Sequence, residues 1–130
     1  MTDASLTILH VEDDADIRMI AAMALTLDPA IRVQSVDTGA AALAVLEQGD
    51  GVPDLLLLDA MLPDMDGTGL LARIRVLPGM ATTPTVFMTA RAQASDLERY
   101  RAAGAIGSIV KPFDPLTLAA RLRTLLAQTG

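Results

Sequence analysis

The chain has 130 residues, a length that suits one domain with a hydrophobic core of its own. It has no cysteine, which excludes disulfide bonds and thiolate metal sites, and its net charge of -6 disfavours direct binding to nucleic acid or to an anionic membrane. It has no run of about 20 apolar residues that could span a membrane, and residues 1–5 lack the basic start of a signal peptide, so a cytoplasmic protein is expected.

Strand patterns and helix patterns alternate along the chain. Short apolar or alternating runs predict strands, and apolar residues that recur every three or four positions predict helices. The expected strands are Leu6–Val11, Ile31–Val36, Asp54–Asp59, Thr85–Met88 and Ile106–Val110. The expected helices run from Asp14 to about Leu27, from Thr38 to Leu46, from Gly67 to Leu77, from Ser95 over a short stretch, and from Asp114 onward.

Three helices have recognisable start signals. Asp14 is expected to cap the first helix, and Ser95 with Glu98 has the spacing of a capping box. Asp114 followed by Pro115 predicts a cap with proline at the first helical position. The inward face of the first helix is expected to carry Ile17, Ile20, Ala21, Ala24 and Leu27.

These elements form five strand–helix units with short connections. Strands that are separated by helices predict a parallel sheet with right-handed crossovers. We therefore expect a doubly wound α/β fold with five strands in the order 2-1-3-4-5 and five helices. In that order the first and third strands are neighbours at the switch point, where such folds place their sites.

Charged residues follow the strands at this edge of the sheet. The run of four leucines from Leu55 ends in Asp59, and the first strand ends in Glu12 and Asp13. Carboxylates that converge repel one another, and a bound cation removes that repulsion. Because the available ligands are oxygens, the sequence favours a hard ion such as Mg²⁺.

Two further residues extend this chemistry. Lys111 follows the fifth strand and offers a positive charge to a phosphoryl oxygen, and Thr89 ends the fourth strand with a hydroxyl donor. An aspartate nucleophile, a divalent metal, a lysine and a hydroxyl together predict an aspartyl-phosphate site at Asp59.

The combined motifs resemble the receiver domain of two-component response regulators, a CheY-like fold related to the flavodoxin-like folds. The resemblance runs from Leu6 to about Leu126 and implies one receiver domain over residues 1–130, with no output domain in this chain. It also implies a signalling switch and not an enzyme that turns over substrate. The motifs that carry it are Glu12-Asp13-Asp14, Asp59-x-Met-Leu-Pro-x-Met-Asp-Gly, Thr89-Ala90 and Lys111-Pro112-Phe113.

The resemblance assigns a role to each motif. It implies that Asp59 accepts a phosphoryl group from a histidine kinase or a histidine phosphotransfer protein, and that Thr89 and Lys111 hold that group. Mg²⁺ would be bound by Asp13, Asp59 and the Met61 carbonyl, with Glu12 acting through water. A cis bond before Pro112 is also implied.

The resemblance also implies how the protein meets its partners. A downstream protein partner would bind the surface of the fourth helix, fifth strand and fifth helix. The protein would be a monomer or a weak homodimer, with no direct binding to nucleic acid or membrane. The run from Glu98 to Arg101 is expected to be a solvated helix face or part of this surface.

Two positions depart from the usual receiver pattern. Glu12 stands where aspartate is commoner, and Ser108 stands where many receivers have tyrosine or phenylalanine. We hypothesise that signalling relies on Thr89 and the loop that follows it, without an aromatic partner. Arg91 has two equal interpretations, one as a shield or attractor at the site and one as a solvated loop residue.

The remaining polar residues have structural interpretations. His10 is expected to be a packed, hydrogen-bonded core residue, and Asp64 and Asp66 are expected to form turns beside Gly67.

The sequence disfavours three other functions. A receiver-fold scaffold without phosphorylation would not need the complete set of acids, Thr89 and Lys111. A phosphatase of the aspartyl-phosphate type would need a second acid where Met61 stands. A nucleotide-binding protein would need a glycine-rich first turn, whereas this turn begins with Glu12 and Asp13.

Overall fold

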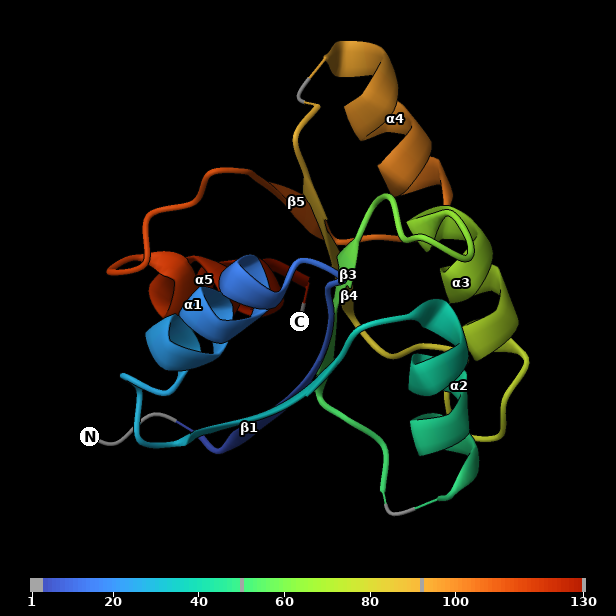
Figure 1. The fold of residues 1–130 in the computed structure, drawn as a ribbon, viewed down its shortest axis with the longest axis horizontal. Helices are drawn as coiled ribbons and strands as arrows, with labels where there is room; N and C mark the ends of the chain where they lie inside the picture. Colours follow the sequence, from blue (N-terminus) through green and yellow to red (C-terminus); the bar gives the residue numbers. More distant parts are fainter. Residues whose placement is uncertain (1–3, 50, 92, 130) are drawn as a thin grey trace.

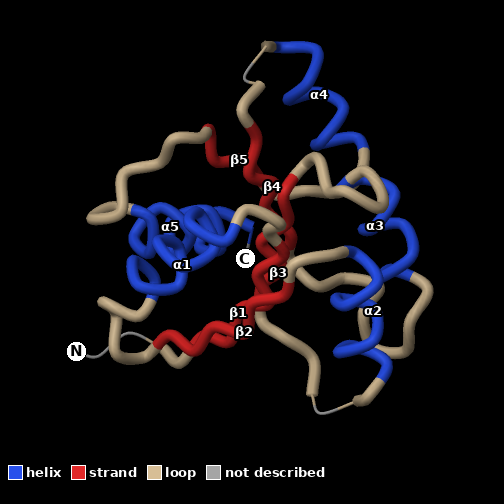
Figure 2. The backbone as a smooth tube through the Cα atoms, viewed as in Figure 1, coloured by secondary structure: helices blue, strands red, loops and turns tan. Residues whose placement is uncertain are grey.

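A computed structural model describes residues 4–49, 51–91 and 93–129 of the chain. Within them, five parallel strands form a sheet in the order β2-β1-β3-β4-β5, which confirms the predicted doubly wound α/β fold (Figures 1 and 2). The strands are β1 (Leu6–Val11), β2 (Ile31–Val36), β3 (Leu55–Asp59), β4 (Thr85–Thr89) and β5 (Gly107–Val110). The helices are α1 (Ala15–Leu25), α2 (Gly39–Glu47), α3 (Gly67–Arg75), α4 (Ala94–Ala102) and α5 (Leu118–Thr129).

The helices cover the sheet on both faces. Helices α1 and α5 lie on one face, and α2, α3 and α4 lie on the other (Figure 1). The four leucines of β3 are completely buried, and they alternate between the two sides. Leu55 and Leu57 pack in the core under α1 and α5, whereas Leu56 and Leu58 pack in the core under α2, α3 and α4. The central strand therefore has no solvent face, as its composition predicts.

Helix α1 begins as predicted but buries only part of the predicted stripe. Asp14 caps it by accepting hydrogen bonds from the N–H groups of Asp16 and Ile17. The buried residues are Ala21, Ala24 and Leu25. Ile20 is 42% exposed, and Leu27, which lies beyond the end of the helix, is 66% exposed, so their predicted inward placement is wrong. Ala21 and Ala24 therefore face the core as predicted, and Leu25 joins them in place of Ile20 and Leu27.

Two other start signals do not act as predicted. Helix α4 begins after Gln93, which makes no side-chain capping bond, and Ser95 already lies inside the helix. The carboxylate of Asp114 accepts a bond from the N–H of Leu116 at 2.9 Å and forms a turn, so α5 begins only at Leu118. In both cases backbone bonds or turns satisfy the groups that a helix cap would otherwise serve.

Strand β3 begins one residue after the predicted start. The side chain of Asp54 accepts a bond from the N–H of Thr7 at 2.8 Å, so Asp54 anchors the start of β3 to β1. None of the helices in the described part of the chain has both the length and the apolar character that a membrane span requires.

Candidate functional site

The strand register brings four strand ends to one edge of the sheet. Val11 is paired with Leu58, Asp59 with Met88, and Thr89 with Val110. Parallel strands therefore place Glu12, Asp59, Thr89 and Lys111 beside one another, although they are separated by up to 99 positions in the sequence.

The acidic residues form a cluster at this edge. Side-chain oxygens of Glu12, Asp13 and Asp59 all lie within 4.8 Å of one another. Glu12 and Asp59 are buried, while Asp13 is exposed to solvent. The predicted convergence of the three carboxyl groups is confirmed.

Lys111 reaches into the acidic cluster from the end of β5. Its Nζ lies 2.7 Å from Oε1 of Glu12 and 3.0 Å from Oδ2 of Asp59. The Lys111–Pro112 bond is cis, as the resemblance implied. Burial opposes the charge of the ammonium, but hydrogen bonds to Glu12 and Asp59 outweigh burial and raise the pKa of Lys111.

Glu12 is the most perturbed acid of the site. Burial raises the pKa of Glu12 to about 7, and the hydrogen-bonded Asp59 carboxyl acts in the same direction. Lys111 and the N–H of Asp14 oppose this rise. A second positive charge in the cluster would favour the ionised form of Glu12 and lower this pKa again.

The donor set fits a magnesium ion. The carboxylates of Glu12, Asp13 and Asp59 are hard oxygen ligands, close enough together to share one ion. Met61 lies just beyond β3, with an exposed side chain and an N–H that donates to Oδ1 of Asp59 at 3.1 Å. The Met61 carbonyl remains the predicted backbone ligand.

Thr89 is fixed by two hydrogen bonds. The N–H of Arg91 donates to its Oγ1 at 2.9 Å, and the hydroxyl of Tyr100 lies 3.1 Å from the same oxygen. Tyr100 belongs to α4 and is only 3% exposed, so the prediction of a solvated face over Glu98–Arg101 is wrong for Tyr100. Thr89 has an aromatic neighbour after all, contributed by a helix and not by β5.

The burial of Tyr100 beside the site was not predicted from the sequence. The residue lies in a run of charged residues, and a single aromatic residue there gives little indication of burial. The available signal was composition: the chain has only one tyrosine and two phenylalanines, so each is a strong candidate for a packed position. In the structure its ring packs on Phe87 of β4, with the centroids 5.0 Å apart.

Three of the predicted site residues line one cleft. A cavity of about 230 Å³ is bordered by Asp59, Thr89 and Lys111, together with Arg91, Arg99 and Tyr100. The side chain of Arg91 is exposed at this cleft, which leaves both interpretations of Arg91 open. Ser108 lies on β5 opposite Phe87 and is half-buried.

His10 is buried on β1 but lacks the predicted hydrogen bonds. It is completely buried, and neither ring nitrogen has a hydrogen-bond partner among the described residues. Burial, reinforced by the charge of Lys111, lowers the pKa of His10 to about 4. His10 is therefore a core residue that is neutral at pH 7.

The loop after β3 is held by backbone-directed contacts. The two carboxylate oxygens of Asp64 accept bonds from the N–H groups of Gly39 and Ala40, both at 3.0 Å, so Asp64 caps α2 in addition to its predicted place in a turn. These bonds lower the pKa of Asp64. The N–H of Gly67 donates to the Ala60 carbonyl at 2.9 Å and closes the loop beside Asp59.

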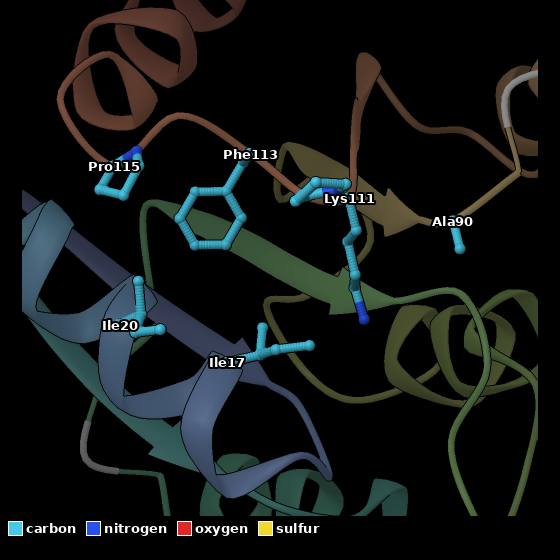
Figure 3. Close-up of a pocket in the computed structure, with 7 residues that line it drawn as sticks. Ile17, Ile20, Ala90, Lys111, Phe113 and Pro115 are labelled. Atoms are coloured by element: carbon cyan, nitrogen blue, oxygen red, sulfur yellow. The ribbon is translucent and has the colours of Figure 1, made fainter.

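An apolar cleft lies beside the acidic cluster. It has a volume of about 580 Å³ and is lined by α1, the loop before α5 and Lys111. Figure 3 shows Ile17 and Ile20 facing Phe113 and Pro115 across the cleft, with Lys111 at one side. Ile20 is 42% exposed, and Met23 and Leu27 are 63% and 66% exposed on or just beyond the same helix.

Comparisons with known proteins agree with this geometry. The family model for the response regulator receiver domain matches residues 8–123. The transcriptional regulatory protein CseB of Streptomyces coelicolor is 37% identical over 123 residues, which cover 95% of this chain and 50% of CseB. The phosphate regulon transcriptional regulatory protein PhoB of Pseudomonas aeruginosa is 35% identical over 124 residues, which cover 95% of this chain and 53% of PhoB. The chain therefore spans about half the length of these relatives.

A solved structure shows the same architecture. The chemotaxis response regulator CheY4 of Vibrio cholerae superposes with a TM-score of 0.84 at 26% sequence identity. The match covers 94% of this chain and 99% of that one.

Proposed function

Because the chain belongs to the response regulator receiver domain family, we propose that it is a phosphorylatable switch whose phosphoryl acceptor is Asp59. The observation that carries the proposal is the cleft in which Asp59, Thr89 and Lys111 meet. The three side chains come from three different strand ends. Because they border one cleft, a shared ligand explains their positions better than three separate structural roles.

The chemistry follows from the charges around Asp59. A carboxylate oxygen of Asp59 attacks the phosphorus of a phosphohistidine, the new oxygen–phosphorus bond forms, and the phosphorus–nitrogen bond to the donor breaks. The Lys111 ammonium, 3.0 Å from Asp59, stabilises the negative charge on the transferred group. Thr89 donates its hydroxyl hydrogen to a phosphoryl oxygen.

Mg²⁺ is the proposed cofactor. Glu12, Asp13, Asp59 and the Met61 carbonyl would hold it. When bound, the ion supplies positive charge that neutralises the phosphoryl oxygens during transfer.

The phosphodonor is a histidine kinase or a histidine phosphotransfer protein, and we place its docking surface at the apolar cleft of Figure 3. Lys111 lines both this cleft and the cavity that holds Asp59. A protein that delivers a phosphoryl group to Asp59 from this side would lie against Ile17, Ile20 and Phe113. The exposed apolar side chains at this mouth suit a protein surface with its own apolar face.

A direct experiment tests the function. The protein is incubated with acetyl phosphate, with and without Mg²⁺, and its intact mass is measured. We expect one phosphoryl adduct that requires Mg²⁺ and is absent from Asp59→Asn. An adduct that survives this substitution, or no Mg²⁺-dependent adduct at all, would overturn the proposal and favour a receiver-fold scaffold.

A further inference from the structure

Tyr100 of α4 contacts the one hydroxyl at the strand edge that the proposed reaction uses. Its phenolic oxygen lies 3.1 Å from Oγ1 of Thr89, and its ring packs on Phe87 with the centroids 5.0 Å apart. The residue is 3% exposed, so its hydroxyl has little access to water as an alternative partner. The contact joins α4 to the end of β4.

The direction of this hydrogen bond decides whether the Thr89 hydroxyl can donate to a phosphoryl group. A threonine hydroxyl has one hydrogen to donate and two lone pairs that accept. The N–H of Arg91 already occupies one lone pair, at 2.9 Å. If Thr89 donates its hydrogen to Tyr100, it has none left for a phosphoryl group. If Tyr100 donates instead, both lone pairs of Thr89 are filled and its hydrogen is free for the phosphoryl oxygen.

We infer that Tyr100 is a positioning residue, which directs the Thr89 hydroxyl toward the phosphoryl group and transmits phosphorylation of Asp59 to α4. The inference rests on the proposed function. On phosphorylation the hydrogen bond between the two hydroxyls reverses, because Thr89 turns its hydrogen to the phosphoryl oxygen and Tyr100 becomes the donor. The aromatic residue that reports on the site thus belongs to α4.

The space around Tyr100 permits such a response. A cavity of about 100 Å³ lies between α4 and β5, and both Tyr100 and Ser108 line it. Ser108 is small, so it leaves this volume open where a larger side chain would close it. The ring of Tyr100 has room to shift with α4 when its hydrogen bond to Thr89 changes.

The composition of the chain provides a specific probe. Tyr100 is the only tyrosine, and the chain has no tryptophan, so tyrosine fluorescence reports on this residue alone. The protein is titrated with beryllofluoride in the presence of Mg²⁺, and adduct formation is followed separately by fluorine NMR. We expect the fluorescence to change in proportion to the adduct and to reach a plateau with it.

A second measurement isolates the hydroxyl. Tyr100→Phe keeps the ring and removes only the hydroxyl, so Thr89 loses the donor that holds its hydroxyl toward the phosphoryl group. Beryllofluoride binding should weaken by up to about fivefold, the factor of one ordinary hydrogen bond, which is the upper limit because the bond between the two hydroxyls is also present before binding. Ser95→Ala removes an exposed hydroxyl from the same helix and should leave the affinity unchanged. Urea unfolding of each variant verifies that the fold is retained.

The outcomes are distinguishable. An adduct that forms without any change in fluorescence, or an unchanged affinity in folded Tyr100→Phe, overturns the role of Tyr100 and leaves the proposed function intact. Failure of the wild-type protein to form the adduct refutes the proposed function, and the role of Tyr100 falls with it.

Discussion

The ammonium of Lys111 lies 2.7 Å from a carboxyl oxygen of Glu12, whose side chain is 1% exposed. The same ammonium lies 3.0 Å from Asp59, so it neutralises part of the charge of two buried carboxyl groups. A proton on Glu12 or a divalent cation can supply the rest. With a metal bound as proposed, this relationship would couple the protonation of the site to metal binding and to the stability of the fold.

The first prediction concerns stability against pH in the absence of divalent cations. His10, with its pKa lowered from 6.5 to about 4, makes the folded state lose stability as the pH falls through this range. Glu12, with its pKa raised from 4.5 to about 7, makes the folded state lose stability as the pH rises through its range. Each effect has a slope of about 1.4 kcal/mol per pH unit, with opposite signs. Where the two ranges overlap, the contributions of these residues to the free energy of unfolding should cancel.

Single substitutions should separate the two effects. In His10→Leu the free energy of unfolding should fall as the pH rises from 4.5 to about 7, because His10 no longer offsets the effect of Glu12. In Glu12→Gln it should fall as the pH drops from 6.5 to about 4. Urea unfolding with a chelator present measures both profiles, and parallel profiles in the two variants would contradict the assignment.

The second prediction concerns Mg²⁺. Binding at Glu12, Asp13 and Asp59 should raise the midpoint of thermal unfolding as the Mg²⁺ concentration increases. The rise should be larger at about pH 8 than at about pH 6, because Mg²⁺ competes with the Glu12 proton below its pKa. Asp13→Asn should reduce the rise. Glu47→Gln, which alters an exposed acid at the end of α2, is the control and should behave like wild type.

The third prediction concerns the apolar cleft. Ile20→Glu places a charge among the apolar residues that line it, so phosphoryl transfer from a histidine kinase that labels the wild type should slow by about tenfold or more. Labelling by acetyl phosphate should be unchanged, because a small donor needs no protein surface. Val76→Glu, at an 82% exposed apolar position after α3, should affect neither reaction. Equal slowing in both variants would place the docking surface elsewhere.

The fourth prediction concerns the loop that follows Asp59. A methyl group at Gly67 would overlap the carbonyl oxygen of Asp59 and lie 3.0 Å from Cα of Ala60. Gly67→Ala should therefore cost about 2 kcal/mol or more in the free energy of unfolding, since the obstructing atoms belong to the backbone. Gly69→Ala, in open space on the same helix, should instead stabilise by up to about 1 kcal/mol. Denaturation of both variants checks the contrast, which an equal effect would refute.

The order of the strands and most of the site could be predicted from local patterns. Apolar runs that end in charge mark strands whose carboxyl ends share one edge, and parallel topology then forces Glu12, Asp59, Thr89 and Lys111 together. The cap at Asp14 could be predicted for the same reason, because the bonds it accepts come from residues two and three positions away.

Helix faces and side-chain partners could not be predicted in this way. The stripe of α1 that is buried depends on how the helix is rotated against the sheet, and in this structure Ile20 is left exposed while Leu25 is buried. The hydrogen bond between Thr89 and Tyr100 depends on the position of α4 over β4. Two residues 11 positions apart, on different elements, meet only because of that packing.

The sequence by itself determined which residue types gather at one edge of the sheet, because the carboxyl ends of parallel strands lie at the same edge. Only the tertiary structure decided how those residues are paired. Lys111 bridges Glu12 and Asp59, His10 has no hydrogen-bond partner among the described residues, and Tyr100 lies against Thr89. Pairing depends on distances of a few ångströms between elements, and these are set by the packing of side chains from the whole chain.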